Sequence, residues 1–380
     1  MKRLFWLGIL GILLSGCIRN SSHESFTYHG DGESFTTYAR GFDVSDCGDF
    51  KLVGVHNPWQ NSRNVTLPYV LAEKRSLVPD SLSDLPFIHI PVQRVITLST
   101  THVAMINQLG MAKTIKGASG VGLIYDPAIR QRIDAGELLE VGYDQGFNYE
   151  TIVSLDPDVL FMYGVEGSVR ATKEKLTELG VPVVFCGDYL EPHPLGKAEW
   201  IRFFSLFYGL EEESNQFFRQ VDSIYQELAS YADRPDHKPV VLTGLPWKDT
   251  WYMAGGKSFA ARLIEDAGGD YLWIDNQSTE AIPLDLESVY ARAVRADIWI
   301  NPGAAGNLEE LNRFDERFRE LPALQQGRVF NNNQRLTNEG GNDYWESGSV
   351  RPHLVLADLM QVFHPDVLTD HQFIYYKKLK

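Results

Sequence analysis

The sequence predicts an α/β protein with two lobes, each built on a largely parallel sheet, joined by one long helix and preceded by a small β-rich extension. From residue 92 onward, short apolar runs alternate with helical periods, which is the pattern of successive strand–helix–strand units. This alternation stops at a long amphipathic segment in the middle of the chain and restarts after it. The 380 residues suffice for two or three domains at roughly 150 residues each.

The N-terminus has the features of a secretory signal. Lys2 and Arg3 precede an apolar run over residues 4–14, which is shorter than the roughly 20 residues that span a bilayer. The run leads into the tetrapeptide LSGC, which resembles a bacterial lipobox. We expect residues 1–16 to be a lipoprotein signal peptide, Cys17 to carry lipid, and residues 17–34 to form a flexible tether. The alternative is an ordinary signal peptide followed by an incidental cysteine.

The body of the chain is then extracytoplasmic, in the periplasm or on the cell surface, and attached to the membrane by lipid only. In that oxidising compartment, Cys47 and Cys186 can form a disulfide. Two free thiols are the other alternative, and the sequence leaves both open. Three cysteines are too few for a disulfide-rich scaffold.

The lobes follow in order along the chain. Residues 35–91 contain short β-type runs, such as 50–55, broken by Gly, Asn and Pro, and predict a few antiparallel strands packed on the first lobe. The first lobe with this extension spans 35–209, with strands expected at 94–98, 158–163 and 181–185. The second lobe spans 235–380 and begins with a strand at 239–243.

The segment between the lobes, 210–234, predicts the connecting helix. Its helical part runs from Glu211 to Tyr231 and ends before Pro235. Apolar side chains recur every three or four residues from Phe217 to Leu228, so they share one face. A helix of this length extends for about 30 Å, which is the width of a small domain.

The two lobes share a local pattern. Asn148 and Asp285 are expected to cap helices, and a glutamate follows each cap by two residues, at Glu150 and Glu287. A Pro-Asp or Ala-Asp pair, an apolar strand and a glycine come next in both lobes. This repetition indicates a pseudo-duplicated fold.

Several function classes are excluded or unsupported by the sequence. The formal charge of −15 argues against a nucleic-acid-binding protein. Residues 255–258 look like the end of a P-loop, but Trp251 stands where the loop needs a glycine, so we expect a turn that caps a helix at Ser258. The chain has no G-x-S-x-G, H-E-x-x-H or C-x-x-C motif. We therefore expect no catalytic residues, no cofactor and no resident metal.

Ligand binding is better supported than catalysis. Ligands of parallel α/β lobes lie beyond the carboxyl ends of the strands. The loops expected there combine aromatic, glycine and small polar residues, which suit a large planar ligand held between lobes. The candidate ligand-binding residues are Thr100, Thr101, His102, Tyr163, Trp247, Trp251, Arg335, Tyr344 and Trp345.

Five stretches within residues 92–365 resemble the substrate-binding lipoproteins of ABC importers for iron chelates, haem or cobalamin. They are residues 94–102, 150–158, 255–269, 283–297 and 341–358, and their order and spacing carry the resemblance. The resemblance implies two Rossmann-like lobes joined by one rigid helix, as in class III periplasmic binding proteins. It also implies that Glu150 and Glu287 dock on the permease, although a glutamate in a first helical turn also favours the helix dipole.

The resemblance implies a metal chelate as cargo and an ABC permease with its ATPase as partners, and we expect a monomer that binds no nucleic acid. An iron complex, either a ferric siderophore or haem, is the first interpretation and cobalamin the second. His102 and Tyr163 are candidate haem-iron ligands, and Arg335 suits a propionate or an anionic siderophore. A bare Zn or Mn carrier and an enzyme acting on a metal chelate are the remaining alternatives.

Overall fold

The computed structural model describes residues 34–143, 146–164, 169–232 and 237–380. Ser34–Lys380 form one compact unit. The expected signal peptide, Cys17 and all of the expected tether except Ser34 lie outside the described residues. In the part that is described, no helix combines the length and apolar character needed to cross a membrane.

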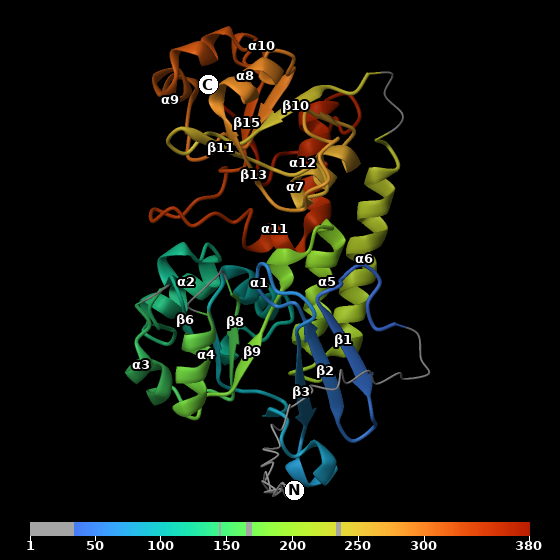
Figure 1. Ribbon diagram of the computed structural model, residues 1–380, viewed down its shortest axis with the longest axis vertical. Coiled ribbons are helices and arrows are strands. Elements are labelled where there is room, and N and C mark those ends of the chain that lie inside the picture. Colours follow the sequence, from blue (N-terminus) through green and yellow to red (C-terminus); the bar gives the residue numbers. More distant parts are fainter. Residues whose placement is uncertain (1–33, 144–145, 165–168, 233–236) are drawn as a thin grey trace, which may run out of the picture. The chain divides into compact units, whose positions relative to one another are not determined.

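The β-rich extension is a four-stranded sheet in the order β1-β2-β3-β4 (Figure 1). The first three strands are antiparallel, as the sequence predicts, whereas β4 joins β3 in parallel. Val53 and Val55, two residues apart on β2, are both buried and therefore face the same side of the sheet. The ring of Phe42 in β1 packs 4.8 Å from that of Trp200. The strands are β1 Phe42–Asp46, β2 Lys51–His56, β3 Thr66–Ala72 and β4 Phe87–His89.

Two buried glutamates hold the backbone segment that leads into β1. Glu199 accepts hydrogen bonds from the backbone N–H groups of residues 37–39 at 2.7–2.8 Å. Glu191 accepts from the next two N–H groups, of residues 40 and 41, both at 2.9 Å. Because these five donors have no strand partner, the two carboxylates take the place of a neighbouring strand.

The first lobe contains a five-stranded parallel sheet in the order β7-β6-β5-β8-β9, covered by helices (Figure 1). The strands β5, β8 and β9 are buried throughout, as expected for strands covered on both faces. Its strands are β5 Val95–Thr97, β6 Ile115–Ala118, β7 Leu139–Glu140, β8 Val159–Met162 and β9 Val183–Phe185, and its helices are α1 Thr100–Gln108, α2 Pro127–Asp134, α3 Tyr149–Ser154 and α4 Val169–Glu178.

The second lobe contains a sheet in the order β12-β10-β14-β15-β16, which is parallel except for β16. A separate antiparallel pair, β11 and β13, lies beside it. Its strands are β10 Val240–Thr243, β11 Thr250–Met253, β12 Asp270–Tyr271, β13 Ile282–Asp285, β14 Ile298–Ile300, β15 Val329–Asn331 and β16 Lys377–Lys378. Its helices are α7 Phe259–Asp266, α8 Leu286–Ala293, α9 Leu308–Phe314, α10 Pro322–Gln325, α11 Ser347–Val350 and α12 Pro352–Phe363.

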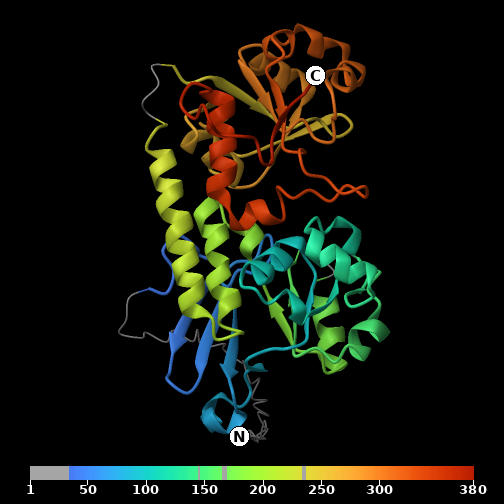
Figure 2. The same ribbon diagram turned by 180° about the vertical axis from the view of Figure 1, so that it is seen from behind.

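Two long helices come between the two sheets in the chain, α5 (Pro194–Ser205) and α6 (Glu211–Ala229). They run side by side, and α6 also packs against α12 of the second lobe (Figures 1 and 2). The sequence predicts the helix from Glu211 to Tyr231, and α6 begins at the same residue and ends two residues earlier. Phe218, Val221 and Tyr225 are buried on its inner face, which confirms the predicted amphipathic stripe.

The predicted repetition between the lobes is present in the structure. The side chains of Asn148 and Asp285 accept hydrogen bonds from backbone N–H groups at the starts of α3 and α8. Asp158 accepts from the backbone N–H of Arg94 at 2.8 Å, and Asp297 accepts from that of Val240 at 2.8 Å. Each of these aspartates therefore joins the strand that follows it to the first strand of its own lobe.

Candidate functional site between the lobes

The strand order of each lobe reverses beside its first strand. In the first lobe, β5 lies between β6 and β8, and in the second lobe β10 lies between β12 and β14. In open α/β sheets, loops diverge at such a switch point and leave room for a ligand. Thr100 begins α1 after β5, Tyr163 directly follows β8, and Trp247 follows β10. These three predicted residues therefore lie at switch points.

Asp188 forms hydrogen bonds with buried polar groups close to the switch point of the first lobe. Its Oδ2 accepts a 2.9 Å hydrogen bond from Oγ1 of Thr101, and its Oδ1 lies 3.3 Å from Nε2 of His102. Burial alone raises the pKa of this carboxyl, but the bonds from His102 and Thr101 and the charge of Lys197 hold the pKa of Asp188 below its usual value. The network ties the start of α1 to the loop after β9.

His102 is completely buried in this network. Its Nδ1 has no hydrogen-bond partner among the described residues. The predicted role of His102 as a haem-iron ligand requires a nitrogen at an accessible surface. The structure instead places His102 inside the lobe, because α1 turns this side chain toward Asp188.

Tyr163 is only partly buried and lies beside a second tyrosine. Its ring is 5.9 Å from that of Tyr189, edge to face. The hydroxyl of Tyr189 donates to the backbone carbonyl of Gly164, and burial raises the pKa of Tyr189 to about 12. Tyr189 is therefore neutral and fixed, and it positions Tyr163 at the end of β8.

The loop after β15 carries three other predicted residues. Arg335 forms a 3.0 Å ion pair with Asp343, and its guanidinium lies 5.2 Å from the ring centre of Tyr125 in the first lobe. Its side chain is 41% exposed, so part of its charge remains accessible. Trp345 is 50% exposed, whereas Tyr344 is buried and packs against Tyr375 and Tyr376. Within this loop, the side chains of Arg335 and Trp345 are accessible, and the buried ring of Tyr344 packs against that of Trp345.

The same part of the second lobe makes direct hydrogen bonds to the first lobe. Glu346 accepts from the backbone N–H groups of Tyr125 at 2.6 Å and Asp126 at 3.0 Å. Thr337 donates to the carbonyl of Gly122 at 2.9 Å. Arg351 donates to the amide oxygen of Gln108 at 2.7 Å. The lobes therefore touch through residues that are more than 200 positions apart in the chain.

A cavity of about 250 Å³ lies between the lobes next to these bonds. Residues of α1 and of the segment before α2 line one side, and residues 335–351 line the other. Its charged lining residues are Asp126, Arg335, Asp343, Glu346 and Arg351. This is a polar chamber that both lobes enclose.

The two predicted tryptophans around β11 lie in different environments. Trp247 is 69% exposed on the connection from β10 to β11. Trp251 is 1% exposed, packs against Trp299 and Phe318, and donates from Nε1 to the carbonyl of Thr243. Trp251 therefore belongs to the core and has no surface to offer to a ligand.

Three further expectations concern individual motifs. Ser258 caps α7, as predicted, and a Cβ at Gly256 would lie 2.4 Å from the carbonyl oxygen of Asn276, so this turn is packed against the chain's own backbone. Cys47 and Cys186 are free thiols, which is the second of the two alternatives. Among the described residues, no group of three or more His, Cys, Asp and Glu side chains has the arrangement of a metal site.

A family model for periplasmic binding proteins matches residues 95–336 of the chain. This chain belongs to the periplasmic binding protein family. The match spans the first lobe, the connecting helix and most of the second lobe, and it confirms the resemblance seen in the sequence.

Relatives and solved structures agree with this membership. An uncharacterized lipoprotein of Methanocaldococcus jannaschii is 25% identical over 416 aligned residues, which cover 100% of this chain and 97% of the relative. The crystal structure of a possible iron-binding, periplasmic solute-binding protein from Staphylococcus epidermidis has a TM-score of 0.55 at 16% identity, covering 72% of this chain and 98% of that chain. The periplasmic haem-binding protein RhuT from Roseiflexus sp. RS-1 has a TM-score of 0.55 at 22% identity, with the same coverage. These structures confirm the predicted α/β fold.

The two glutamates expected to dock on a permease occupy matching positions in this periplasmic binding protein. Glu150 and Glu287 are the second residues of α3 and α8, and both are exposed. Glu287 forms a 3.2 Å ion pair with Arg317, which is itself held by Asp315. Its side chain remains 75% exposed, so it is accessible despite the pair.

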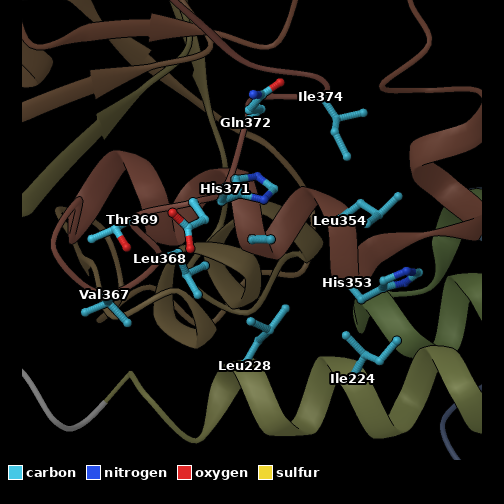
Figure 3. Close-up of a pocket in the computed structure, with 12 residues that line it drawn as sticks. Ile224, Leu228, His353, Leu354, Val367, Leu368, Thr369, His371, Gln372 and Ile374 are labelled. Carbon is cyan, nitrogen blue, oxygen red and sulfur yellow. The ribbon is translucent and has the colours of Figure 1, made fainter.

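A second cavity, of about 480 Å³, lies between α6 and α12 (Figure 3). Ile224 and Leu228 project into it from α6, opposite His353 and Leu354 of α12 and the segment 367–374. Most of its lining is apolar. None of its lining residues directly follows the end of a strand, so we do not include it in the candidate site of this binding protein.

Asp188, Tyr125 and Glu346 lie at the candidate site but are not among the residues predicted from the sequence. Asp188 follows β9 by three residues, so the rule that ligands lie beyond strand ends was sufficient to find it. Glu346 and Tyr125 have no such signal, because their bond joins two loops 221 residues apart.

Proposed function

We propose that this periplasmic binding protein is the substrate-binding lipoprotein of an ABC importer and captures an iron complex, a ferric siderophore or haem, between its lobes. The observation that carries the proposal is the placement of partly exposed aromatic residues at both switch points. Tyr163 lies at the switch point of the first lobe and Trp247 at that of the second. Aromatic faces at these positions suit a large planar or ring-rich chelate.

An iron complex is favoured by the polar groups near these aromatics. The phenol oxygen of Tyr163 is a group that can ligate haem iron. The partly exposed guanidinium of Arg335 suits a carboxylate, whether of a propionate or of a siderophore. Two structural neighbours, one named a possible iron-binding protein and the other a haem-binding protein, support the same class of cargo.

The anchor and the delivery step complete the proposal. A relative that spans the whole chain is named a lipoprotein, which supports lipid attachment at Cys17. Exposed Glu150 and Glu287, one in each lobe, suit two equivalent basic sites on a two-fold permease, whose ATPase drives import. Pairing between exposed charges mainly speeds the encounter of the binding protein with the permease and fixes their relative orientation. The protein acts as a monomer, needs no cofactor and catalyses no reaction.

A titration tests the cargo. The mature chain with Cys17→Ser is titrated with haem, with ferric catecholate and hydroxamate siderophores, and with cobalamin, following tryptophan quenching and the absorption spectrum. We expect quenching by an iron complex, and for haem a Soret shift that disappears in Tyr163→Phe. Tyr290→Phe is the matched control, because Tyr290 lies on α8 and its hydroxyl donates to the backbone carbonyl of Arg317. Quenching by cobalamin alone would replace iron with a corrinoid, and no response to any ligand would overturn the cargo assignment.

A further inference from the structure

The carboxylate of Glu346 bridges the two lobes and is shielded from water. Glu346 is 2% exposed. Its Oε2 accepts the N–H of Tyr125 at 2.6 Å, and its Oε1 accepts the N–H of Asp126 at 3.0 Å. Asp126 is the N-cap of α2, so one side chain of the second lobe satisfies two successive backbone donors where a helix of the first lobe begins. A bridge with both oxygens engaged fixes the position of one lobe against the other.

The groups around Glu346 disfavour the ionised form of its carboxyl group when the lobes are in contact. Asp126 faces it from the start of α2, and Asp343 faces it from its own loop. Arg335 is paired with Asp343, and Arg351, before α12, is bound to Gln108 of α1. Two phenols also lie nearby: Arg335 lies over the ring of Tyr125, and the hydroxyl of Tyr375, whose pKa burial raises to about 12, lies 3.0 Å from that of Ser347. No cation is therefore bonded to the Glu346 carboxylate among the described residues.

Burial and the two neighbouring aspartates raise the pKa of Glu346 to about 7, although the two N–H donors act in the opposite direction. Separation of the lobes would return this side chain to water, where a glutamate has a pKa of about 4.3. Between these values, the closed state holds one more proton than the open state. Closure is then favoured as the pH falls through 7 and weakened above it.

We propose that Glu346 is a proton-linked latch, which holds the lobes together through Tyr125 and Asp126 and takes up one proton from solvent on closing. When protonated, Glu346 keeps a carbonyl oxygen as an acceptor and no longer repels Asp126 and Asp343. The other two bridges, from Thr337 and Arg351, end on carbonyl and amide oxygens that do not titrate. The proposal rests on the proposed function only in requiring that the lobes separate to admit cargo.

Hydrogen–deuterium exchange of the full chain in detergent, without cargo, reports on the latch directly. The amide hydrogens of Tyr125 and Asp126 are its donors, so a peptide over residues 121–130 is followed at pH 6 and pH 8, with rates corrected for intrinsic exchange. Wild type is expected to be roughly tenfold more protected at pH 6 than at pH 8. In Glu346→Gln, which is neutral, keeps a carbonyl acceptor and cannot take up a proton, we expect protection close to that of wild type at pH 6 and no dependence on pH.

Glu191→Gln is the matched control. Glu191 is also buried, also accepts from two successive backbone N–H groups, those of Arg40 and Gly41, and also has a raised pKa. Its bonds lie within the first lobe and its extension. This variant should change exchange near residues 40 and 41 and leave residues 121–130 as in wild type.

Three outcomes would overturn the latch. These are wild-type protection that does not change with pH, a Glu346→Gln variant that keeps the wild-type pH dependence, and a Glu191→Gln variant that also alters residues 121–130. A peptide over β8 reports whether Glu346→Gln is folded; if it is not, Glu346→Asp, which is too short to reach both donors, replaces it. Because no cargo is used, a failed cargo titration leaves this result unaffected, and a failed latch leaves the cargo assignment unaffected.

Discussion

The carboxylate of Asp188 lies 3.3 Å from Nε2 of His102, and both side chains are buried inside the first lobe. Thr101 and Lys197 share the same carboxylate, the first by a hydrogen bond and the second by its charge. A single acid in the loop after β9 thus binds two polar groups of α1 and offsets the charge of Lys197 in α5. Its removal leaves the buried imidazole of His102 without this hydrogen-bond partner and the buried ammonium of Lys197 without this opposite charge, which is costly.

Replacement of Asp188 by alanine is therefore expected to lower the free energy of unfolding by about 2–4 kcal/mol. Asp275→Ala is the control, because Asp275 forms an ion pair with Arg292 and its side chain is 71% exposed. We expect the control to change stability by less than about 0.5 kcal/mol. Guanidinium chloride unfolding of both variants measures the difference, and equal effects would contradict the role of Asp188.

The contribution of Asp188 to the free energy of unfolding should also depend on pH. The pKa of Asp188 is below its usual value in the folded protein, so its contribution is present above the ordinary aspartate range and is lost as the pH falls through the folded-state value. The stability gap between wild type and Asp188→Asn is therefore expected to shrink between pH 7 and pH 3. Unfolding curves at several pH values measure this gap, and a gap that widens toward acid would refute the assignment.

Two tryptophans should respond in opposite ways to substitution. Trp251→Ala creates a cavity next to Trp299 and is expected to destabilise the protein by about 3–5 kcal/mol. Trp345→Ala removes a half-exposed ring, so stability should change by less than about 0.5 kcal/mol while cargo affinity falls up to about tenfold. Thermal unfolding and cargo titration measure the two effects. Unchanged affinity in Trp345→Ala would remove Trp345 from the site.

The docking role of the exposed glutamates predicts a loss of transport without a loss of binding. In Glu150→Ala/Glu287→Ala, cargo affinity should match wild type and uptake by cells should be abolished. The control is Glu174→Ala/Glu309→Ala, which removes two other exposed helical glutamates that pair with Arg170 and Arg313. Normal uptake in the first variant, or equal losses in both, would contradict docking through α3 and α8.

Glu199 is expected to hold the segment before β1 in place. Glu199→Ala removes the acceptor of three backbone N–H groups, so we expect about 2–4 kcal/mol lower stability and faster tryptic cleavage after Arg40. Glu227→Ala, on the exposed side of α6, is the control and should be cleaved like wild type. Mass spectrometry of the fragments measures cleavage. Cleavage of Glu199→Ala at the wild-type rate would show that Glu191 and the pairing of the following strand β1 are sufficient to hold this segment.

Local sequence patterns determined the class of fold and many of its elements. The alternation of apolar runs and helical periods, the caps at Asn148, Ser258 and Asp285, and the start of α6 at Glu211 all depend on residues within a few positions of one another. Such patterns act through backbone hydrogen bonds and a repeating apolar face, and both are readable along a single element. The order and spacing of several such stretches also indicated the family.

The tertiary structure decided which side chains are available to a ligand. His102 and Tyr163 both follow strands of the first lobe, yet α1 buries His102 against Asp188 while Tyr163 stays partly exposed. Trp251 and Trp345 have the same chemistry, and only packing makes one a core residue. The bond from Glu346 to Tyr125 joins segments 221 residues apart, and its geometry exists only once the two lobes are in contact. Burial and long-range pairing depend on how whole elements pack, and that information is not contained in any one stretch of the chain.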